Sequence, residues 1–254
     1  LIFYDKDAGA PQIRCQRFDE RGNRTGRDTP IVNENGGQLD ASLIDQKRVA
    51  LAYSIAGGAI KLVVLTIDQN VIRGTDGEDQ IVGSDEADLI LTGLGNDIID
   101  AGDGNDEVNA SPGDDLVRGQ AGNDLIRGGE GRDILAGNEG ADGLFGGAGD
   151  DYLAGGQGDD IILGEDGDDN VIGGQGGDVI HGGDGDDTLN GGSGNDSIAG
   201  GLGRDIVDGG LGQDTLKGGR GSDRFIFRDN YGDAVIVDFN ADGESDLIDL
   251  SGVS

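Results

Sequence analysis

The chain has 254 residues, of which 53 are glycine and only 3 are proline, and it carries 51 acidic and 18 basic side chains. The formal net charge of -33 argues against nucleic acid or an anionic membrane as a partner and favours a cation. No stretch approaches the roughly 20 apolar residues of a transmembrane helix, and the glycines lack the strict spacing of collagen. The glycine excess instead indicates a tight turn that is used many times.

The first 73 residues differ in composition from the rest, with nine acidic and ten basic side chains. Residues 49–54 and 60–68 are predicted to form a hairpin. A strand-turn-strand pattern in residues 4–19 recurs 49 residues later in residues 53–68. We therefore expect residues 1–73 to be a separate β-rich segment that belongs to a longer array.

From Gly74 onward the chain repeats every nine residues without an insertion or a deletion. The unit is Gly-Gly-x-Gly-x-Asp-x-apolar-x, and its positions are numbered one to nine below. Seventeen copies span residues 74–226; position six is aspartate in all of them, and position four is glycine in 16, with Glu86 as the exception. Position eight is apolar in every copy, from Ile81 to Phe225.

This pattern predicts a tight glycine loop followed by a very short strand in each unit. Such a strand cannot bury its apolar residue alone, so consecutive units must wind into a solenoid with two units per coil and a core of stacked position-eight side chains. The loops then alternate between two edges, and each loop stacks on the loop two units away. The predicted fold class is all-β, a right-handed parallel β-roll related to the β-helix, with an N-terminal antiparallel β segment and a C-terminal β cap.

The stacking places position-six carboxylates about 4.8 Å apart, where they repel each other unless a cation lies between them. Calcium suits the site because it takes six to eight oxygen ligands, and glycine loops can supply carbonyl oxygens beside the aspartates. Pairs of adjacent loops number eight on one edge and seven on the other, which sets an upper limit of about 15 ions. Residues 74–226 carry 35 acidic and 7 basic side chains, so about 15 divalent ions would bring them close to neutrality. The candidate metal ligands are Asp79, Asp88, Asp97, Asp106, Asp115, Asp124, Asp133, Asp142, Asp151, Asp160, Asp169, Asp178, Asp187, Asp196, Asp205, Asp214 and Asp223.

These nonapeptides resemble the repeats-in-toxin family, also described as hemolysin-type calcium-binding repeats, over about three fifths of the chain. The resemblance implies a calcium-bound parallel β-roll in which the aspartates and neighbouring loop carbonyls hold calcium between coils. It also implies export of the unfolded chain through a type I secretion channel and folding in extracellular calcium. Sites near Glu86, and beside Arg132 and Arg204 at position five, are expected to be altered or empty.

Without calcium, the same stretch is expected to behave as a flexible acidic linker. A core of single stacked aliphatic side chains is too thin to offset chain entropy and charge repulsion. Binding and folding are therefore expected to be coupled.

The pattern changes after Phe225, and residues 224–227 and 234–239 are predicted to be ordinary strands of a cap that spans 227–254. Residues 246–251 resemble the region that follows the repeats in secreted proteases of the family. The family usually continues to a secretion signal, so we expect the protein to extend beyond residue 254. Whether some apolar residues at positions seven and nine form an outward patch or are covered by the flanks stays open: Leu89, Leu91, Ile98, Leu163 and Ile172.

Within the cap, Asp238, Asn240, Asp242, Gly243 and Asp249 match positions 1, 3, 5, 6 and 12 of an EF-hand calcium loop. A strand rather than a helix precedes the loop, and aspartate replaces the usual bidentate glutamate. A polar turn is therefore the default interpretation, and a separate calcium site is the alternative.

Catalysis finds little support in the sequence. The single histidine, His181, falls at position nine of its repeat, where a solvent-exposed strand residue is expected. The chain has one cysteine, Cys15, and neither a His-Glu-x-x-His zinc motif nor a Gly-x-Ser-x-Gly elbow. We therefore predict that this chain is not an enzyme.

The predicted function is calcium binding by a secreted, extracellular β-roll that forms a structural part of a large bacterial surface, matrix or adhesive protein. Its expected partners are calcium ions, with other copies of the chain or cell-surface components as further candidates. The alternative is the C-terminal secretion and folding module of an exported protease, lipase or cytolysin. Carbohydrate binding by residues 1–73 is a third hypothesis. The resemblance of those residues to β-rich repeats upstream of calcium rolls in very large surface proteins favours the first.

Overall fold

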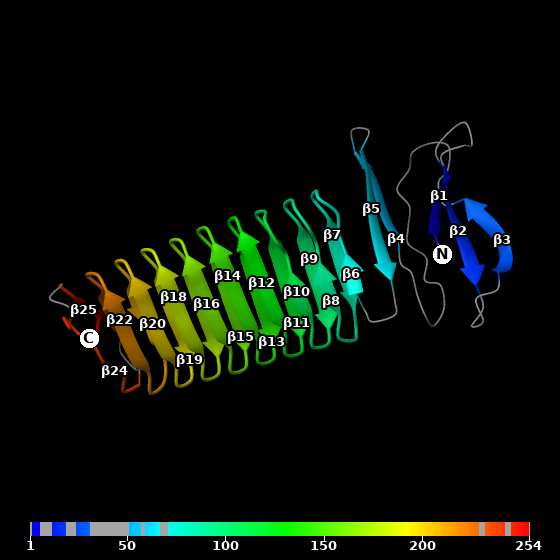
Figure 1. Cartoon of the computed structure of the whole chain (residues 1–254). Helices are drawn as coiled ribbons and strands as arrows, with labels where there is room; N and C mark the ends of the chain where they lie inside the picture. The colour runs from blue at the N-terminus through cyan, green and yellow to red at the C-terminus, as the bar shows by residue number, and fades with distance from the viewer. Residues whose placement is uncertain are drawn as a thin grey trace.

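The computed structural model describes residues 2–5, 12–18, 24–30, 51–56, 59–66, 71–228, 232–241 and 245–253. From residue 71 onward, two parallel sheets face each other and their strands alternate along the chain (Figure 1). The first sheet contains β6 (Val71–Arg73), β8 (Leu89–Leu91), β10 (Glu107–Asn109), β12 (Leu125–Glu130), β14 (Gly143–Ala148), β16 (Ile161–Asp166), β18 (Val179–Asp184), β20 (Ser197–Leu202), β22 (Thr215–Arg220) and β24 (Val235–Ile236). The second contains β7 (Gln80–Ser84), β9 (Ile98–Asp103), β11 (Leu116–Ala121), β13 (Ile134–Glu139), β15 (Tyr152–Gln157), β17 (Asn170–Gln175), β19 (Thr188–Ser193), β21 (Ile206–Asp208), β23 (Arg224–Arg228) and β25 (Leu247–Gly252).

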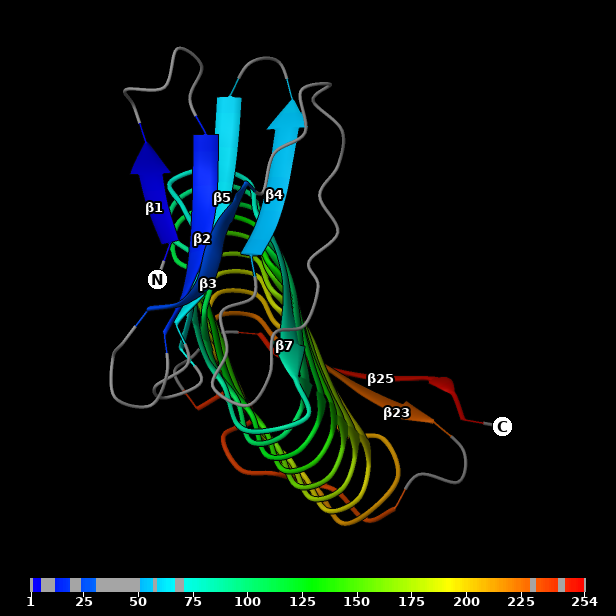
Figure 2. The ribbon, with the colours of Figure 1, turned by 90° about the vertical axis from the view of Figure 1, so that its right-hand side faces the viewer.

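One coil of the solenoid takes two repeats. Within the repeats, each strand pairs in parallel with the strand two units away, so Val117 of β11 lies beside Ile99 of β9 and Leu135 of β13. Figure 2 looks along the solenoid and shows the loops of successive coils stacked on one another. The parallel β-roll, the eighteen-residue coil and the loop stacking predicted from the nonapeptide period are all confirmed.

The core is a narrow file of position-eight side chains. All seventeen are at most 3% exposed, and Ile72, one unit before the first repeat, adds another buried rung at 5%. Position-seven side chains face outward, and Ile98, Ile134 and Ile161 are 43%, 49% and 51% exposed. Among the other residues considered for an outward patch, four are half-buried: Leu89, Leu91, Leu163 and Ile172.

Antiparallel strands precede the roll. β4 (Leu51–Ala56) and β5 (Ala59–Thr66) form a hairpin at the predicted place, and β5 pairs antiparallel with β6, so the hairpin extends the first sheet. β1 (Ile2–Asp5), β2 (Gln12–Phe18) and β3 (Arg24–Pro30) form another antiparallel sheet. The 49-residue repetition and the division of the chain into three segments stay predictions.

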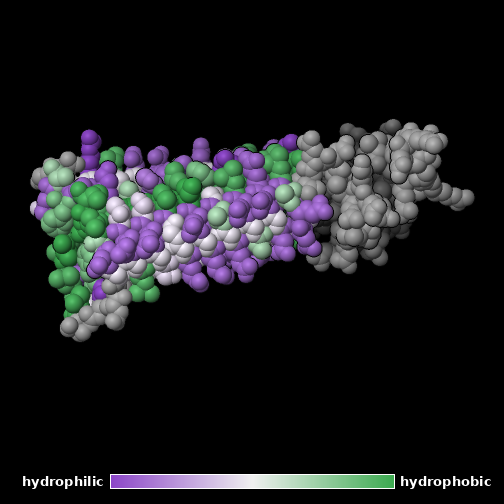
Figure 3. Space-filling view, turned by 90° about the horizontal axis from the view of Figure 1, so that it is seen from below, coloured by the Kyte–Doolittle hydropathy of each residue, from purple (hydrophilic) through white to green (hydrophobic). Residues whose placement is uncertain are grey.

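At the C-terminal end, β24 and β25 continue the two parallel sheets. Ile236 lies beside Leu216, and Ile248 lies beside Phe225. Ile248 is 41% exposed, whereas Phe225 is fully buried, so the core file opens toward solvent at this end. Figure 3 shows apolar residues gathered there. The role of residues 227–254 as a cap stays a prediction.

The structure predicts that Ile162→Ala will lower the free energy of unfolding by about 2–5 kcal/mol, because it empties a fully buried rung of the core. Ile161→Ala is the matched control: the neighbouring side chain faces solvent, so the expected loss is about 0.5 kcal/mol or less. Urea unfolding in saturating calcium measures both. Equal losses for the two variants would contradict the assigned core.

Candidate metal centre

The aspartates of position six form two ladders, one along each edge of the roll. Every one of the seventeen predicted aspartates is buried, with an exposure between 1% and 6%. Each directly precedes the strand residue at position seven, and the strand pairing stacks it on the aspartate eighteen residues away. The backbone amide of Asp115, for example, donates a hydrogen bond of 2.8 Å to Oδ1 of Asp133, and that of Asp133 donates one of 2.8 Å to Asp151.

The same bond recurs along both ladders. From Asp79 to Asp205, each amide donates to Oδ1 of the aspartate in the next coil at 2.7–3.0 Å. Except in the first rungs, Asp79 and Asp88, Oδ1 of each aspartate thus accepts a hydrogen bond from the backbone of the preceding coil. The second carboxylate oxygen, Oδ2, is the atom that remains available to a ligand.

In twelve of the aspartates, Oδ2 is buried and has no hydrogen-bond partner. A buried, unpartnered carboxylate oxygen is costly, because it has lost its hydration without replacement. A regular series of such oxygens marks a place where a cation fits. The twelve are Asp106, Asp115, Asp124, Asp133, Asp142, Asp151, Asp160, Asp169, Asp178, Asp187, Asp196 and Asp205.

Burial raises the pKa of all twelve carboxyls above the usual value for aspartate. The pKa rises to about 7 for Asp115, Asp151 and Asp160, and to about 6 for Asp133 and Asp142. Loss of solvation is the main cause, the backbone hydrogen bond opposes it, and the charges of neighbouring aspartates add to it. The ladders are therefore unstable in their fully ionised form unless positive charge enters them.

Glycines leave the space that such an ion requires. A Cβ added at Gly128, a position-one glycine, would lie 2.1 Å from Oδ2 of Asp133. A Cβ added at Gly131, where the loop turns with a φ of +134°, would lie 2.0 Å from the carbonyl oxygen of Gly113 in the preceding coil. Position one is glycine in 14 of the 17 repeats, with Thr92, Ala101 and Ala110 as the exceptions, so most repeats keep side chains out of the space beside the carboxylate.

The donor set fits calcium rather than a softer metal. Within the described part of the chain, no three His, Cys, Asp or Glu side chains converge on one point. An ion between two loops would therefore be held by aspartate oxygens together with backbone carbonyls, which is an all-oxygen set of the kind that calcium prefers.

Arg132 and Arg204 point away from the ladders. The Arg132 guanidinium lies 3.7 Å from Oδ2 of Asp114, and Arg204 pairs with Asp186; each partner is a position-five aspartate of the preceding coil. Both arginines are more than two-thirds exposed. The neighbouring Asp133 and Asp205 each have an Oδ2 without a hydrogen-bond partner. That the sites beside the two arginines are altered or empty stays a prediction.

The structure adds one ladder member that the repeat pattern misses. Asp246 follows Asp223 after 23 residues instead of eighteen, yet its Oδ1 accepts the Asp223 amide at 3.1 Å, as the earlier rungs do. Its Oδ2 accepts the amide of Asn240 at 2.6 Å. The signal that could have found it is local: Asp246-Leu247-Ile248 repeats the order of positions six to eight.

The residues of the EF-hand-like pattern have other partners. Asp238 accepts the amides of Gly218 and Gly219 at 3.0 Å each. Asp249 accepts the amide of Ser251 at 2.9 Å and forms an ion pair with an arginine. Two members of the pattern lie outside the described residues: Asp242 and Gly243. A separate calcium site there stays a prediction.

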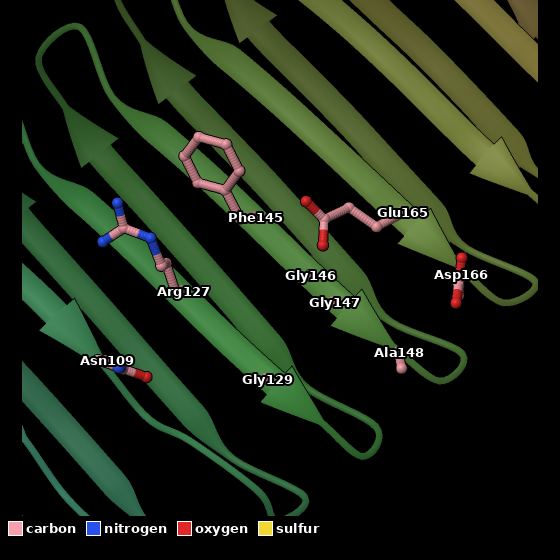
Figure 4. A pocket seen from close by; sticks show the side chains of 9 residues that line it. All are labelled: Asn109, Arg127, Gly129, Phe145, Gly146, Gly147, Ala148, Glu165 and Asp166. Atoms are coloured by element: carbon pink, nitrogen blue, oxygen red, sulfur yellow. The ribbon is translucent and has the colours of Figure 1, made fainter.

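The outer face of the first sheet carries a shallow groove (Figure 4). Its lining includes Gly129 and Gly147 beside the side chains of Arg127 and Phe145. The Arg127 guanidinium lies 5.6 Å from the Phe145 ring centroid and 3.1 Å from Oε1 of Glu107. The arginine therefore links three neighbouring strands. His181, also at position nine, is exposed as expected.

The RTX calcium-binding nonapeptide repeat family matches this chain in eight segments, most of them overlapping, between residues 73 and 225. The chain belongs to this family. Its repeats bind calcium and form a β-roll, which is a structural fold rather than a catalytic one. No curated protein matches the chain. The part of the chain that the structure describes contains no helix long and apolar enough to cross a membrane.

The raised pKa values predict that the calcium-free chain will gain β structure as the pH falls from about 7.5 to about 5. In ten of these aspartates the roll raises the pKa to about 6 or about 7, whereas the unfolded chain titrates near the ordinary value of about 3.9. Between those values the roll binds more protons, so its stability rises as the pH falls and levels off below the unfolded pKa.

Far-ultraviolet circular dichroism in a chelator measures this change. The chain in saturating calcium is the control and starts with its β signal already present. If the calcium-free chain gains no β signal between about pH 7.5 and pH 5, ionisation of the ladder aspartates does not destabilise the roll as predicted.

Proposed function

We propose that calcium ions lie between stacked loops along both edges and that the chain folds into a rigid rod when it meets extracellular calcium. The rod would serve as a structural part of a large secreted bacterial surface, matrix or adhesive protein. The ligands would be the seventeen predicted aspartates and the loop carbonyls beside them, with up to about 15 ions.

The unpartnered Oδ2 atoms carry this proposal. They recur at one position of the repeat, in buried sites such as those of Asp142 and Asp160, eighteen residues apart on one edge. An accidental packing fault would leave a single polar atom without a partner. Here the unpartnered oxygen recurs once per coil on each edge. A divalent cation satisfies both members of a neighbouring pair at once.

The charge of the roll supports the same conclusion. Residues 74–226 carry 35 acidic and 7 basic side chains, so the metal-free roll opposes its own compact state. Binding of calcium supplies the missing positive charge where the buried carboxylates need it. Folding and calcium binding are then one process, and calcium concentration acts as the switch.

The structural role rests on shape and on family. The roll is long and narrow (Figure 1), and its strands are joined to an antiparallel hairpin rather than to a catalytic unit within the described residues. Proteins with RTX repeats are typically exported by type I secretion. An exported chain passes from low to high calcium, which suits a rod that must stay unfolded until it is outside the cell.

A calcium titration followed by far-ultraviolet circular dichroism tests the proposal. The chain is expected to gain β signal cooperatively with calcium, to lose it on addition of a chelator, and to respond little to magnesium, which accepts such irregular carbonyl-rich sites poorly. A chain that is fully β-structured in chelator at neutral pH and indifferent to calcium would overturn the proposal.

A matched pair of variants sharpens the test. Substitution by asparagine of Asp142, Asp160 and Asp178, on one ladder, is expected to raise the calcium concentration at the folding midpoint by about tenfold or more. The control replaces Asp103, Asp166 and Asp184, which are exposed at position three, and so makes the same change in charge. If both variants raise the midpoint calcium concentration equally, net charge is the cause, and the proposal that the ladder aspartates bind calcium is contradicted.

A further inference from the structure

The first two loops of the roll differ in backbone conformation from all the later ones. From the third loop onward, the residues at positions two and four have positive φ, as at Gly93 and Gly95. The rule holds even where position two carries a side chain, as at Gln120 with a φ of 81°. In the loops 74–79 and 83–88, the residues at these two positions are not among those of the described chain with positive φ.

This difference changes the surroundings of the first two aspartates. The Thr75 amide donates to Oδ2 of Asp79 at 2.7 Å, and the Thr75 hydroxyl lies 3.1 Å from the same oxygen. The Ser84 amide donates to Oδ2 of Asp88 at 2.7 Å, and the Ser84 hydroxyl lies 2.9 Å from it. The oxygen that has no partner in the twelve later aspartates is therefore satisfied twice in each of these loops.

The position of the two loops gives this arrangement a reason. Asp79 and Asp88 are the first members of their ladders, so each has a neighbouring aspartate on one side only. A terminal carboxylate can share no more than one interloop ion. Hydrogen bonds from its own loop satisfy it without any ion, and Thr75 and Ser84 supply them at position two.

We propose that Thr75 and Ser84 make the first coil of the roll metal-free, and that the calcium ladders begin at the loops 92–97 and 101–106. The inference rests on the proposed calcium function and narrows it. Hydroxyl and amide donors take the place of calcium at Asp79 and Asp88, so the upper limit falls from about 15 to about 13 ions. The backbone conformation at position two distinguishes these loops, since Ser111 stands at the same position with a φ of 68° and leaves Oδ2 of Asp115 without a partner.

Equilibrium dialysis against calcium chloride, with elemental analysis of the bound metal, tests this on the whole chain. Asp79→Asn with Asp88→Asn is expected to leave the number of bound ions unchanged. The matched control, Asp160→Asn with Asp169→Asn, also alters one loop at each edge and is expected to lose about two to four ions, because each of these aspartates borders two sites. Equal losses in the two variants would overturn the proposal.

Thr75→Gly with Ser84→Gly provides a second measurement that leaves every aspartate in place. Removing the hydroxyls and permitting positive φ is expected to add up to about two ions per chain. An unchanged ion count would overturn the proposal. A parent chain that binds no calcium would instead overturn the proposed function, so the two failures are distinguishable.

Discussion

The structure depends on one constraint: carboxylates are buried in register, one above another, along both edges of the roll. Two unit charges about 4.8 Å apart at an effective dielectric constant of about 20 repel by on the order of 3 kcal/mol, and each inner rung has two such neighbours. Loss of solvation is the main cause that raises the pKa of Asp133, and the hydrogen bond from the Asp115 amide lowers that pKa only in part. The glycines beside the carboxylates and the all-oxygen lining of the loops follow from the need to admit a cation there.

The same constraint underlies the proposed coupling of folding to calcium binding. Its core is a single file in which each coil contributes two position-eight residues, such as Ile162 and Val171, while the outer faces remain in contact with water. Each coil touches only its neighbours, so stability accumulates along the axis as in other solenoids. An ion between two loops strengthens the contact between coils, which is where a solenoid is held together. The thin core is therefore the physical reason for the proposed dependence of folding on calcium.

Most of the fold could be predicted from the sequence, because an unbroken nonapeptide period determines register, core and ladder at once. The burial of Ile162 and Asp160 follows from position alone. The period could not reveal how individual loops depart from the average. In the sequence, Thr75 and Ser84 look like ordinary substitutions of glycine. In the structure, each donates a backbone hydrogen bond to Oδ2 of the aspartate in its own loop. The period also misses Asp246, because this residue follows Asp223 at a different spacing. In the structure it nevertheless accepts the Asp223 amide, as the other ladder members do.

Calcium binding between the stacked aspartates is tested by an anomalous difference map from crystals grown in calcium, collected at a wavelength where calcium scatters anomalously. Two rows of peaks are expected, one along each edge of the roll, with each peak lying between stacked aspartates such as Asp142 and Asp160. A well-ordered roll whose map shows no peaks between those aspartates would contradict it, since the buried oxygens would then be tolerated without a metal.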